Sequence, residues 1–461
     1  MWDIAEAQTV PYIAGIMHPT GFPAYTIAGW LFAHVFAAGN VAWRMSVLSA
    51  LAGAVATALL ARTACDLGVS ALPAFAAALA FGLTDAVWKH ASRAGTQSLA
   101  MLFAVLALGA ALERRPERTQ RAFVAAAAWM GLAMATHPLA VWFVPGMVVL
   151  LAAQRPRTSA RTIATACGAF AAMLLLYAYL PLRSAAITAA QLDPVAAVLH
   201  LDGYPIWNYD APARWSGFLA LVTGAEFHAG ASLAAPLEAA RYPEYAARFA
   251  DILSSQYGWL GVALIAAGAF ALRRRPLVLL GLALTAFLVV PFSLTYGALF
   301  EAEKYYLLSA WIAALLLALG MQAAAAALRT QSAEYEALPV LLAGAIAGVN
   351  LASGTHFFDQ RNDRRADALI DDVRANVPDR AVVWTPWWYA TALAHAAYVR
   401  GDLGARIPVS SVAHDRMVQT ARAEVRPLYY IPLPESDIRI DGARLTALPG
   451  SDPVIYRVEV P

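Results

Sequence analysis

Two carboxylates, Asp3 and Glu6, stand at the start of a chain that is apolar over most of its length. Their three-residue spacing places both side chains on one face if the segment is helical. A carboxylate beside a membrane cleft can act as a general base on the hydroxyl group of an acceptor. The plainer interpretation is that both are solvated acids of a loop. The pair is the first candidate for catalysis in this sequence.

Basic side chains form a second candidate group, because they fall near the outer ends of the helices that we expect to cross a membrane. Those that can bind a phosphate or an acceptor are His18, Arg44, Arg93, His137 and Arg183. Arginine suits bidentate contacts to phosphate, although an arginine at a helix end can also simply reach into the headgroup region. The pair His18-Pro19 is by default a rigid turn. Together these acids and bases predict a surface that holds an anionic lipid phosphate and presents a carboxylate to an acceptor.

The composition limits the classes of protein to which the chain can belong. Its 461 residues are 60% hydrophobic and 14% charged, whereas soluble domains carry about 25% charged residues. The formal net charge of +2 is too small to indicate a nucleic-acid partner. The sequence has no P-loop, no dinucleotide-binding glycine pattern and no spacing of zinc ligands. We therefore expect a membrane protein with no resident metal or cofactor.

Apolar segments near the length of a spanning helix, about 20 residues, recur along the chain. They lie at about 41–62, 70–88, 96–112, 121–136, 138–153, 161–181, 258–272, 277–296, 305–328 and 337–354. Three short loops are strongly basic, at 113–121, 154–161 and 273–275. Basic loops face the cytoplasm, so a loop at about 182–257 and everything after about residue 355 are predicted to lie outside.

Successive spans cross the membrane in alternating directions, and this alternation predicts that residues 1–40 lie outside as well. Residues 21–40 contain Pro23 and His34, and we interpret them as an amphipathic helix on the outer membrane surface. An ordinary short span is the alternative. Because no signal peptide precedes Asp3, we expect a first transmembrane helix to be missing from this sequence, with Met1 an internal codon or a cut.

The predicted organisation has three parts. Residues 1–40 form the first external loop with its interfacial helix, residues 41–354 the transmembrane helical domain, and residues 355–461 a small external α/β domain. The last part is predicted from helix patterns at 359–380 and 387–400 and from short apolar runs, typical of strands, at 381–386, 427–433 and 454–460.

The opening of the chain resembles a known family of polytopic membrane proteins. The likeness rests on WDIAEAQTVPYIAGIMHPTGFPAY at 2–25 and GNVAWR at 39–44, where the family has Trp-Asp-Ser-Gly-Glu, His-Pro-Pro-Gly-x-Pro and Asn-x-x-Trp-Arg. Supporting matches are YLPLR (179–183), NYD (208–210), FLALVTGAEF (218–227) and FEAEKYYLLSAW (300–311). The family is that of the protein O-mannosyltransferase transmembrane protein 260 and its bacterial relatives of unknown function. The chain departs from the family at GTQSL (95–99), where relatives have Glu-x-Tyr.

The resemblance implies a membrane glycosyltransferase of the C-type fold, an all-α polytopic protein with about 10–11 spans here, followed by the small α/β domain. It implies that Asp3 is the general base and that Glu6 supports it or shares acceptor binding. Arg44, with Arg93 or Arg183, would hold the donor phosphate in place of a metal. A mannose-like sugar would move, with inversion, from a polyprenyl phosphate to a hydroxyl group of a protein or surface glycan. The site would face outward from the inner (plasma) membrane.

Two other classes of function remain open. One is a transporter or lipid flippase that uses the same outer charges as a binding path, and the other is an inactive membrane scaffold. Transporters usually show internal repeats and broken helices near the middle of the bilayer. Here the polar residues gather at one predicted face without an evident repeat, which favours an enzyme.

Overall fold

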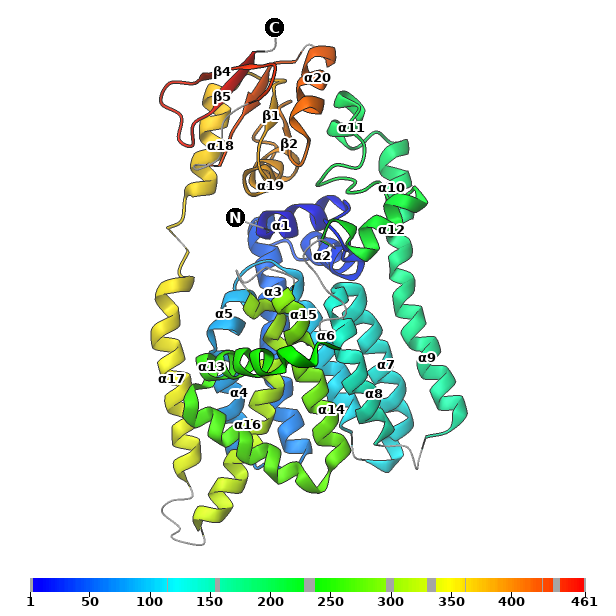
Figure 1. Cartoon of the computed structure of the whole chain (residues 1–461), viewed down its shortest axis with the longest axis vertical. Helices are drawn as coiled ribbons and strands as arrows, with labels where there is room; N and C mark the ends of the chain where they lie inside the picture. The colour runs from blue at the N-terminus through cyan, green and yellow to red at the C-terminus, as the bar shows by residue number, and fades with distance from the viewer. Residues whose placement is uncertain are drawn as a thin grey trace. The chain divides into compact units, whose positions relative to one another are not determined.

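The computed structural model describes residues 3–113, 115–153, 158–227, 237–295, 302–329, 337–360, 362–424, 426–433 and 440–459. Trp2, residues 154–157 of a predicted basic loop and residues 300–301 of the FEAEKYYLLSAW stretch lie outside the described residues. The chain forms two compact units (Figure 1). Unit 1 consists of Met1–Ser46, Tyr177–Glu226 and Gln360–Pro461, and unit 2 consists of Val47–Leu176 and Phe227–Asp359.

Unit 2 is helical throughout its described part. Its α-helices are α3 (Val41–Asp66, which begins in unit 1), α4 (Ala71–Gly82), α5 (Asp85–Ala91), α6 (Thr96–Ala111), α7 (Thr119–Thr136), α8 (Val144–Ala152), α9 (Ala160–Leu174), α13 (Tyr242–Ala271), α14 (Pro276–Phe287), α15 (Val289–Thr295), α16 (Leu307–Arg329) and α17 (Leu338–Phe358). Short 3₁₀ segments are η1 (Pro116–Arg118), η2 (Pro138–Phe143), η4 (Leu175–Ala178, which extends into unit 1), η7 (Ala239–Arg241), η8 (Leu272–Arg274) and η9 (Ala302–Tyr306). Each predicted span is therefore mainly helical where it is described, and the one at 70–88 is divided between α4 and α5.

Five stretches within the described residues are long and apolar enough to cross a membrane. They are Val41–Asp66, Ala160–Ala189, Ala239–Arg274, Pro276–Leu294 and Glu303–Arg329. The pair α4 and α5 is a sixth candidate, bent by 65°, and shorter apolar helices lie at Thr96–Ala111, Pro138–Ala152 and Leu338–Ala352. The chain is thus a multi-pass membrane protein, as its composition predicted.

Close contact between α13 and α16 forms the centre of unit 2. A Cβ atom on Gly268 would lie 1.9 Å from the carbonyl oxygen of Leu316, and one on Gly320 would lie 1.9 Å from that of Leu264. Only glycine permits this approach, which is how helices in lipid gain packing contacts. Helix α13 also breaks at Gly258, where φ is 64° and ψ is 167°. The predicted span at 258–272 begins at this break. The turns before Gly258 are also helical, but they carry charged residues and therefore do not form an apolar segment in the sequence.

Unit 1 combines short helices with one sheet. Its elements are α1 (Ile4–Ile13), α2 (Pro23–Val35), α10 (Tyr179–Ala189), α11 (Pro194–Leu199), α12 (Trp215–Thr223), η5 (Ala225–Phe227, whose last residue is in unit 2), α18 (Arg365–Asn376), β1 (Val382–Trp384), α19 (Trp387–His395), the π-helical turn η11 (Ala396–Arg400), β2 (Ile407–Val409), α20 (His414–Glu424), β3 (Leu428–Tyr430), β4 (Arg444–Ala447) and β5 (Tyr456–Glu459). The predicted α/β character of the C-terminal part is therefore confirmed.

The strands of unit 1 lie in the order β2-β1-β3-β5-β4. Strand β1 pairs in parallel with β2 and β3, with Val382 opposite Ile407 and Leu428. Strand β5 runs antiparallel to β3 and β4. Alternate side chains face opposite sides of a strand, so Val382 packs with the core of α11 and α20, while Val383 packs with that of α18 and α19. Helices thus cover both faces of the sheet (Figure 1).

Candidate active site

The first helix, α1, presents both N-terminal carboxylates. Asp3 directly precedes the helix, and its carbonyl oxygen accepts the Ala7 N–H at 2.8 Å. Glu6 lies in the first turn and is fully buried. Negative charge is favoured at the N-terminal end of a helix. The three-residue spacing therefore has the predicted effect, since both carboxyl groups lie near one end of α1.

The loop after α1 brings His18 back to this end of the helix. The N–H of Gly21 donates to the carbonyl oxygen of His18 at 2.8 Å, which closes the turn. Gly21 has a φ of +83°, and a Cβ atom there would lie 2.9 Å from Cδ1 of Leu180. A larger residue would be strained at that φ and would meet α10. The glycine is therefore needed to direct His18 inward.

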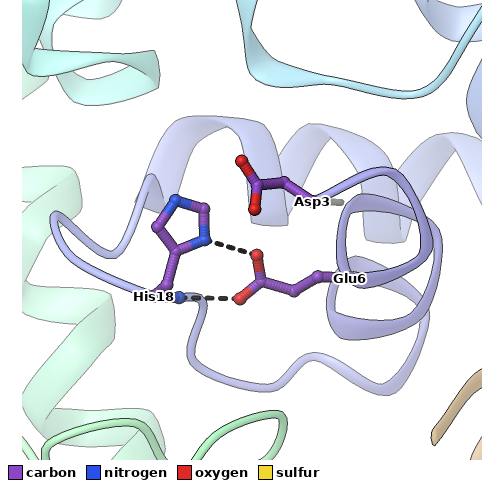
Figure 2. Close-up of side chains that lie close together, drawn as sticks. All are labelled: Asp3, Glu6 and His18. Carbon is purple, nitrogen blue, oxygen red and sulfur yellow. Dashed lines mark hydrogen bonds and ion pairs between the residues drawn. The ribbon is translucent and has the colours of Figure 1, made fainter. Parts of the chain in front are cut away.

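Glu6 holds His18 through both of its carboxylate oxygens (Figure 2). The backbone N–H of His18 donates to Oε1 of Glu6 at 2.8 Å, and Nδ1 of the imidazole forms a short hydrogen bond with Oε2. Burial raises the pKa of the Glu6 carboxyl, and the neighbouring imidazole opposes that shift. The carboxyl of Glu6 therefore has a partner for each oxygen inside the protein.

Asp3 lies beside this pair and has a further partner from the C-terminal part of the chain. Asp3, Glu6 and His18 each offer one ligand atom, and the three atoms lie within 4.8 Å of one another (Figure 2). The indole Nε1–H of Trp387 donates to Oδ1 of Asp3 at 3.0 Å. Two carboxylates and an imidazole suit a divalent cation, but a cation bound to Oε2 of Glu6 would have to replace its bond to the imidazole. In the cluster, hydrogen bonds within the protein therefore occupy both oxygens of Glu6 and Oδ1 of Asp3.

Two further acids, Asp210 and Glu226, lie near the cluster. The hydroxyl of Tyr209 donates to Oε2 of Glu226 at 2.9 Å, and its ring centroid lies 6.2 Å from that of Trp387. Burial, and secondarily the charge of Glu226, raises the pKa of Asp210 to about 6. The two sequence stretches NYD and FLALVTGAEF thus meet here, which their positions in the sequence did not reveal.

Arg183 lies at the other end of α1. Its Nε donates to the carbonyl oxygen of Ala14 at 2.6 Å and its Nη2 to that of Ile13 at 3.2 Å. The hydroxyl of Tyr179, one turn earlier in α10, donates to the carbonyl oxygen of Gly15 at 3.0 Å. These donors satisfy the last carbonyl groups of α1, which helices leave without partners. Arg183 therefore fixes the C-terminal end of α1, the helix whose N-terminal end carries Asp3 and Glu6.

Arg44 is bound by the last turn of α2 and by the loop that follows it. Its guanidinium donates to four carbonyl oxygens at 2.8–3.1 Å. They belong to Ala33, Ala37, Ala38 and Gly39. A guanidinium has five N–H groups, so these bonds leave at most one for a phosphate. The structure gives Arg44 a structural role between α2 and α3, where the sequence alone had predicted donor binding.

Unit 2 contains the other two predicted binding residues. Arg93 is half-buried between α5 and α6. The Nδ1 atom of His137 accepts the N–H of Leu139 at 3.2 Å, so this histidine caps η2. A small cavity of about 30 Å³ is lined by His137, Gln97 and Lys304 together with apolar side chains. Lys304 lies in the FEAEKYYLLSAW stretch but is not among the binding residues predicted from the sequence.

The sequence therefore identified three residues that the structure brings together, Asp3, Glu6 and His18. It missed Trp387, which is separated from Asp3 by 384 positions. The available signal was weak: the Trp-Trp-Tyr run at 387–389 follows a predicted strand, and parallel strands present functional side chains at their carboxyl ends.

Comparison with known proteins supports the predicted resemblance. Residues 3–160 match the family described as Protein O-mannosyl-transferase TMEM260 N-terminal domain. Protein O-mannosyl-transferase TMEM260 of Mus musculus is 30% identical over 190 residues, which are 40% of this chain and 27% of that protein. The Dictyostelium discoideum protein of the same description is 33% identical over 57 residues, 12% of this chain and 7% of its own length. The matched regions thus span only about 27% or less of these relatives.

Solved structures show the fold. ArnT from Cupriavidus metallidurans, in a crystal structure bound to undecaprenyl phosphate, aligns with a TM-score of 0.60 and 12% identity over 99% of this chain and 92% of ArnT. The apo structure of ArnT aligns with a TM-score of 0.51 and 11% identity over 99% of this chain and 93% of ArnT. The chain thus has the C-type glycosyltransferase fold of ArnT, and over residues 3–160 it is similar to the TMEM260 family, as its opening motifs predicted.

Proposed function

We propose that this chain is a membrane glycosyltransferase that moves a mannose-like sugar from a polyprenyl-phosphate donor to a hydroxyl group. The preferred acceptor in this proposal is a protein. The observation that carries the proposal is the cluster of Asp3, Glu6 and His18. The cluster lies in the stretch that matches the TMEM260 family, on a chain with the fold of ArnT. The TMEM260 proteins are O-mannosyl-transferases, which suggests the sugar, and ArnT binds undecaprenyl phosphate, which suggests the kind of donor lipid.

In the proposed reaction, Asp3 acts as the general base. Its carboxylate takes the proton of the acceptor hydroxyl while the hydroxyl oxygen bonds to the anomeric carbon of the sugar. The bond between that carbon and the phosphate oxygen breaks, and the polyprenyl phosphate leaves with the electron pair. The nucleophile and the leaving group lie on opposite faces of the sugar, so the configuration at the anomeric carbon inverts.

The donor phosphate needs positive charge or hydrogen-bond donors as it leaves. His18 is one candidate, since it lies in the cluster and is 18% exposed. Arg93 and His137 keep their proposed part in donor or acceptor binding, whereas the backbone bonds of Arg44 and Arg183 assign these two mainly to structure. Because both oxygens of Glu6 are bonded to His18, we propose that the reaction needs no resident metal.

We further propose that the chain lies in the inner (plasma) membrane with this cluster on the extracytoplasmic face. The loops at 113–121, 154–161 and 273–275 are positively charged, and positive charge favours the cytoplasmic side for them. A protein or a surface glycan on the outer face would then be the acceptor.

The test uses the full chain in lipid nanodiscs with undecaprenyl-phosphate-[³H]mannose and a Ser/Thr-rich acceptor peptide. We expect transfer by the wild type, also in the presence of EDTA, and a loss of at least about 10³-fold in Asp3→Asn, because the general base is removed. Asp371→Asn is the matched control, since its carboxylate is 62% exposed on α18 and is expected to leave the rate unchanged.

The alternative functions give different results when the same protein is also reconstituted in sealed vesicles. No transfer by the wild type, with movement of the labelled lipid between the two faces of a vesicle, would favour a flippase. Neither transfer nor movement would favour a scaffold. Full transfer by Asp3→Asn would remove Asp3 from catalysis, and loss of transfer with EDTA would contradict the metal-free proposal.

A further inference from the structure

We propose that Trp387, from the C-terminal α/β part of the chain, is a positioning residue for the Asp3 carboxylate. The inference rests on the proposed function, because it assigns Trp387 a part in the same reaction. Its basis is the hydrogen bond of 3.0 Å from the indole Nε1–H to Oδ1 of Asp3. A carboxylate that must take a proton in one direction benefits from restricted rotation, and a rigid donor to one of its oxygens restricts that rotation.

Trp387 is well placed for this part because it begins α19. The preceding residue is Pro386, which cannot donate a backbone N–H and has a restricted φ. Strand β1 ends at Trp384, inside the sheet, so only a short connection separates the indole from the core of unit 1. The position of the donor is therefore set by the sheet rather than by a flexible loop.

A second contact fixes α19 against α1. Nδ1 of His395 lies 3.1 Å from the hydroxyl oxygen of Thr9. That hydroxyl gives its single proton to the carbonyl oxygen of Ala5 at 2.7 Å, so Nδ1–H of His395 is the donor between the two side chains. Burial, and secondarily the charge of Arg400, lowers the pKa of His395 to about 4, which keeps the imidazole neutral. The two helices are thus joined at Asp3 and again at Thr9.

The indole also contacts the other groups of the cluster. Its ring centroid lies 6.0 Å from that of His18 and 6.2 Å from that of Tyr209, both edge to face. Such aromatic contacts hold a ring against rotation. Trp387, from the third chain segment of unit 1, therefore contacts residues of both other segments at the candidate site.

The experiment compares Trp387→Phe with the wild type in the transfer assay described above. Phenylalanine keeps an aromatic ring but removes the N–H donor. We expect kcat to fall by about 10- to 100-fold with the KM for the donor lipid within about twofold, because a carboxylate out of position affects the reacting geometry more than donor binding. Trp215→Phe, at a tryptophan that is 71% exposed, is the matched control and is expected to behave as the wild type.

A measurement independent of turnover follows the indole N–H resonances of the 13 tryptophans in ¹⁵N-tryptophan-labelled full chain. The signal of Trp387 is the one that disappears in Trp387→Phe, and we expect it to shift in Asp3→Asn and to stay in Asp371→Asn. The comparison of Asp3→Asn with the wild type keeps the tryptophan. If Trp387→Phe does not fold, the signal of Trp387 is assigned instead from its absence in Trp387→Tyr or Trp387→His.

The outcomes separate the two proposals. An active wild type with unchanged kcat in Trp387→Phe, or an indole signal unmoved by Asp3→Asn, would overturn the positioning role alone. An inactive wild type whose indole signal does respond to Asp3→Asn would overturn the proposed function, and the contact would then be structural.

Discussion

Glu6 offers the sharpest test of how the cluster works, because its side chain is fully buried and serves one partner. In Glu6→Gln the size of the side chain is kept while its charge and one acceptor oxygen are lost. The backbone N–H of His18 can still donate to the remaining oxygen, as it does to Glu6 at 2.8 Å. The bond to Nδ1 of the imidazole is replaced by an amide that presents N–H groups to the ring.

The size of the effect follows from that lost bond. A hydrogen bond to a charged group contributes about 1.5–3 kcal/mol, and about 1.4 kcal/mol corresponds to a tenfold change in rate. If the full loss is felt when the reaction occurs, kcat falls by about 10- to 150-fold. Burial raises the pKa of Glu6, which means that its ionised form is costly in the folded chain. The neutral Gln variant should therefore remain folded.

The assay measures initial rates against donor and acceptor concentration, with thermal unfolding of the same samples. Glu244→Gln is the matched control, since this carboxylate is 54% exposed and pairs with Arg241. A fall in kcat with unchanged KM values would agree with a role in holding His18. A raised KM for the acceptor with unchanged kcat would refute it and would assign Glu6 to acceptor binding. A rate within about twofold of the wild type would show that the bond to His18 does not matter for turnover.

Two further predictions concern stability. Burial raises the pKa of Asp193 from 3.8 to about 7. Between these values the folded chain holds a proton that the unfolded chain has released, so stability falls as pH rises through this window. Asp193→Asn keeps an acceptor for the Val195 N–H and should make Tm depend less on pH between about 4 and 7, and equal slopes of Tm against pH for variant and wild type would contradict this. Arg44→Lys loses most of four bonds to backbone carbonyls. It should lower the free energy of unfolding by about 1–3 kcal/mol with an unchanged KM for the donor lipid. A large rise in that KM with unchanged Tm would show instead that Arg44 binds the donor.

Features that depend on neighbouring residues could be predicted from the sequence. Each apolar segment became helical, although the one at 70–88 divides into α4 and α5 with a bend of 65°. About 20 apolar residues in a row satisfy both lipid and the backbone without a distant partner. The strands β1, β3 and β5 also followed from short apolar runs. Strand β2, helix α20 and strand β4 did not, because Pro408 interrupts the apolar run of β2 and because α20 and β4 carry many polar residues.

The same distinction divides the candidate site. Asp3, Glu6 and His18 were identified because they lie within sixteen positions and have chemically suggestive types. The partners were decided by tertiary structure. Glu6 is paired by the turn that returns His18, and Asp3 by Trp387 at a separation of 384 residues. Arg44 is likewise bound by four carbonyl groups of α2 and the loop after it. A sequence states which groups can donate or accept. Which donor reaches which acceptor depends on the folded path of the backbone, since hydrogen bonds act only within about 3 Å.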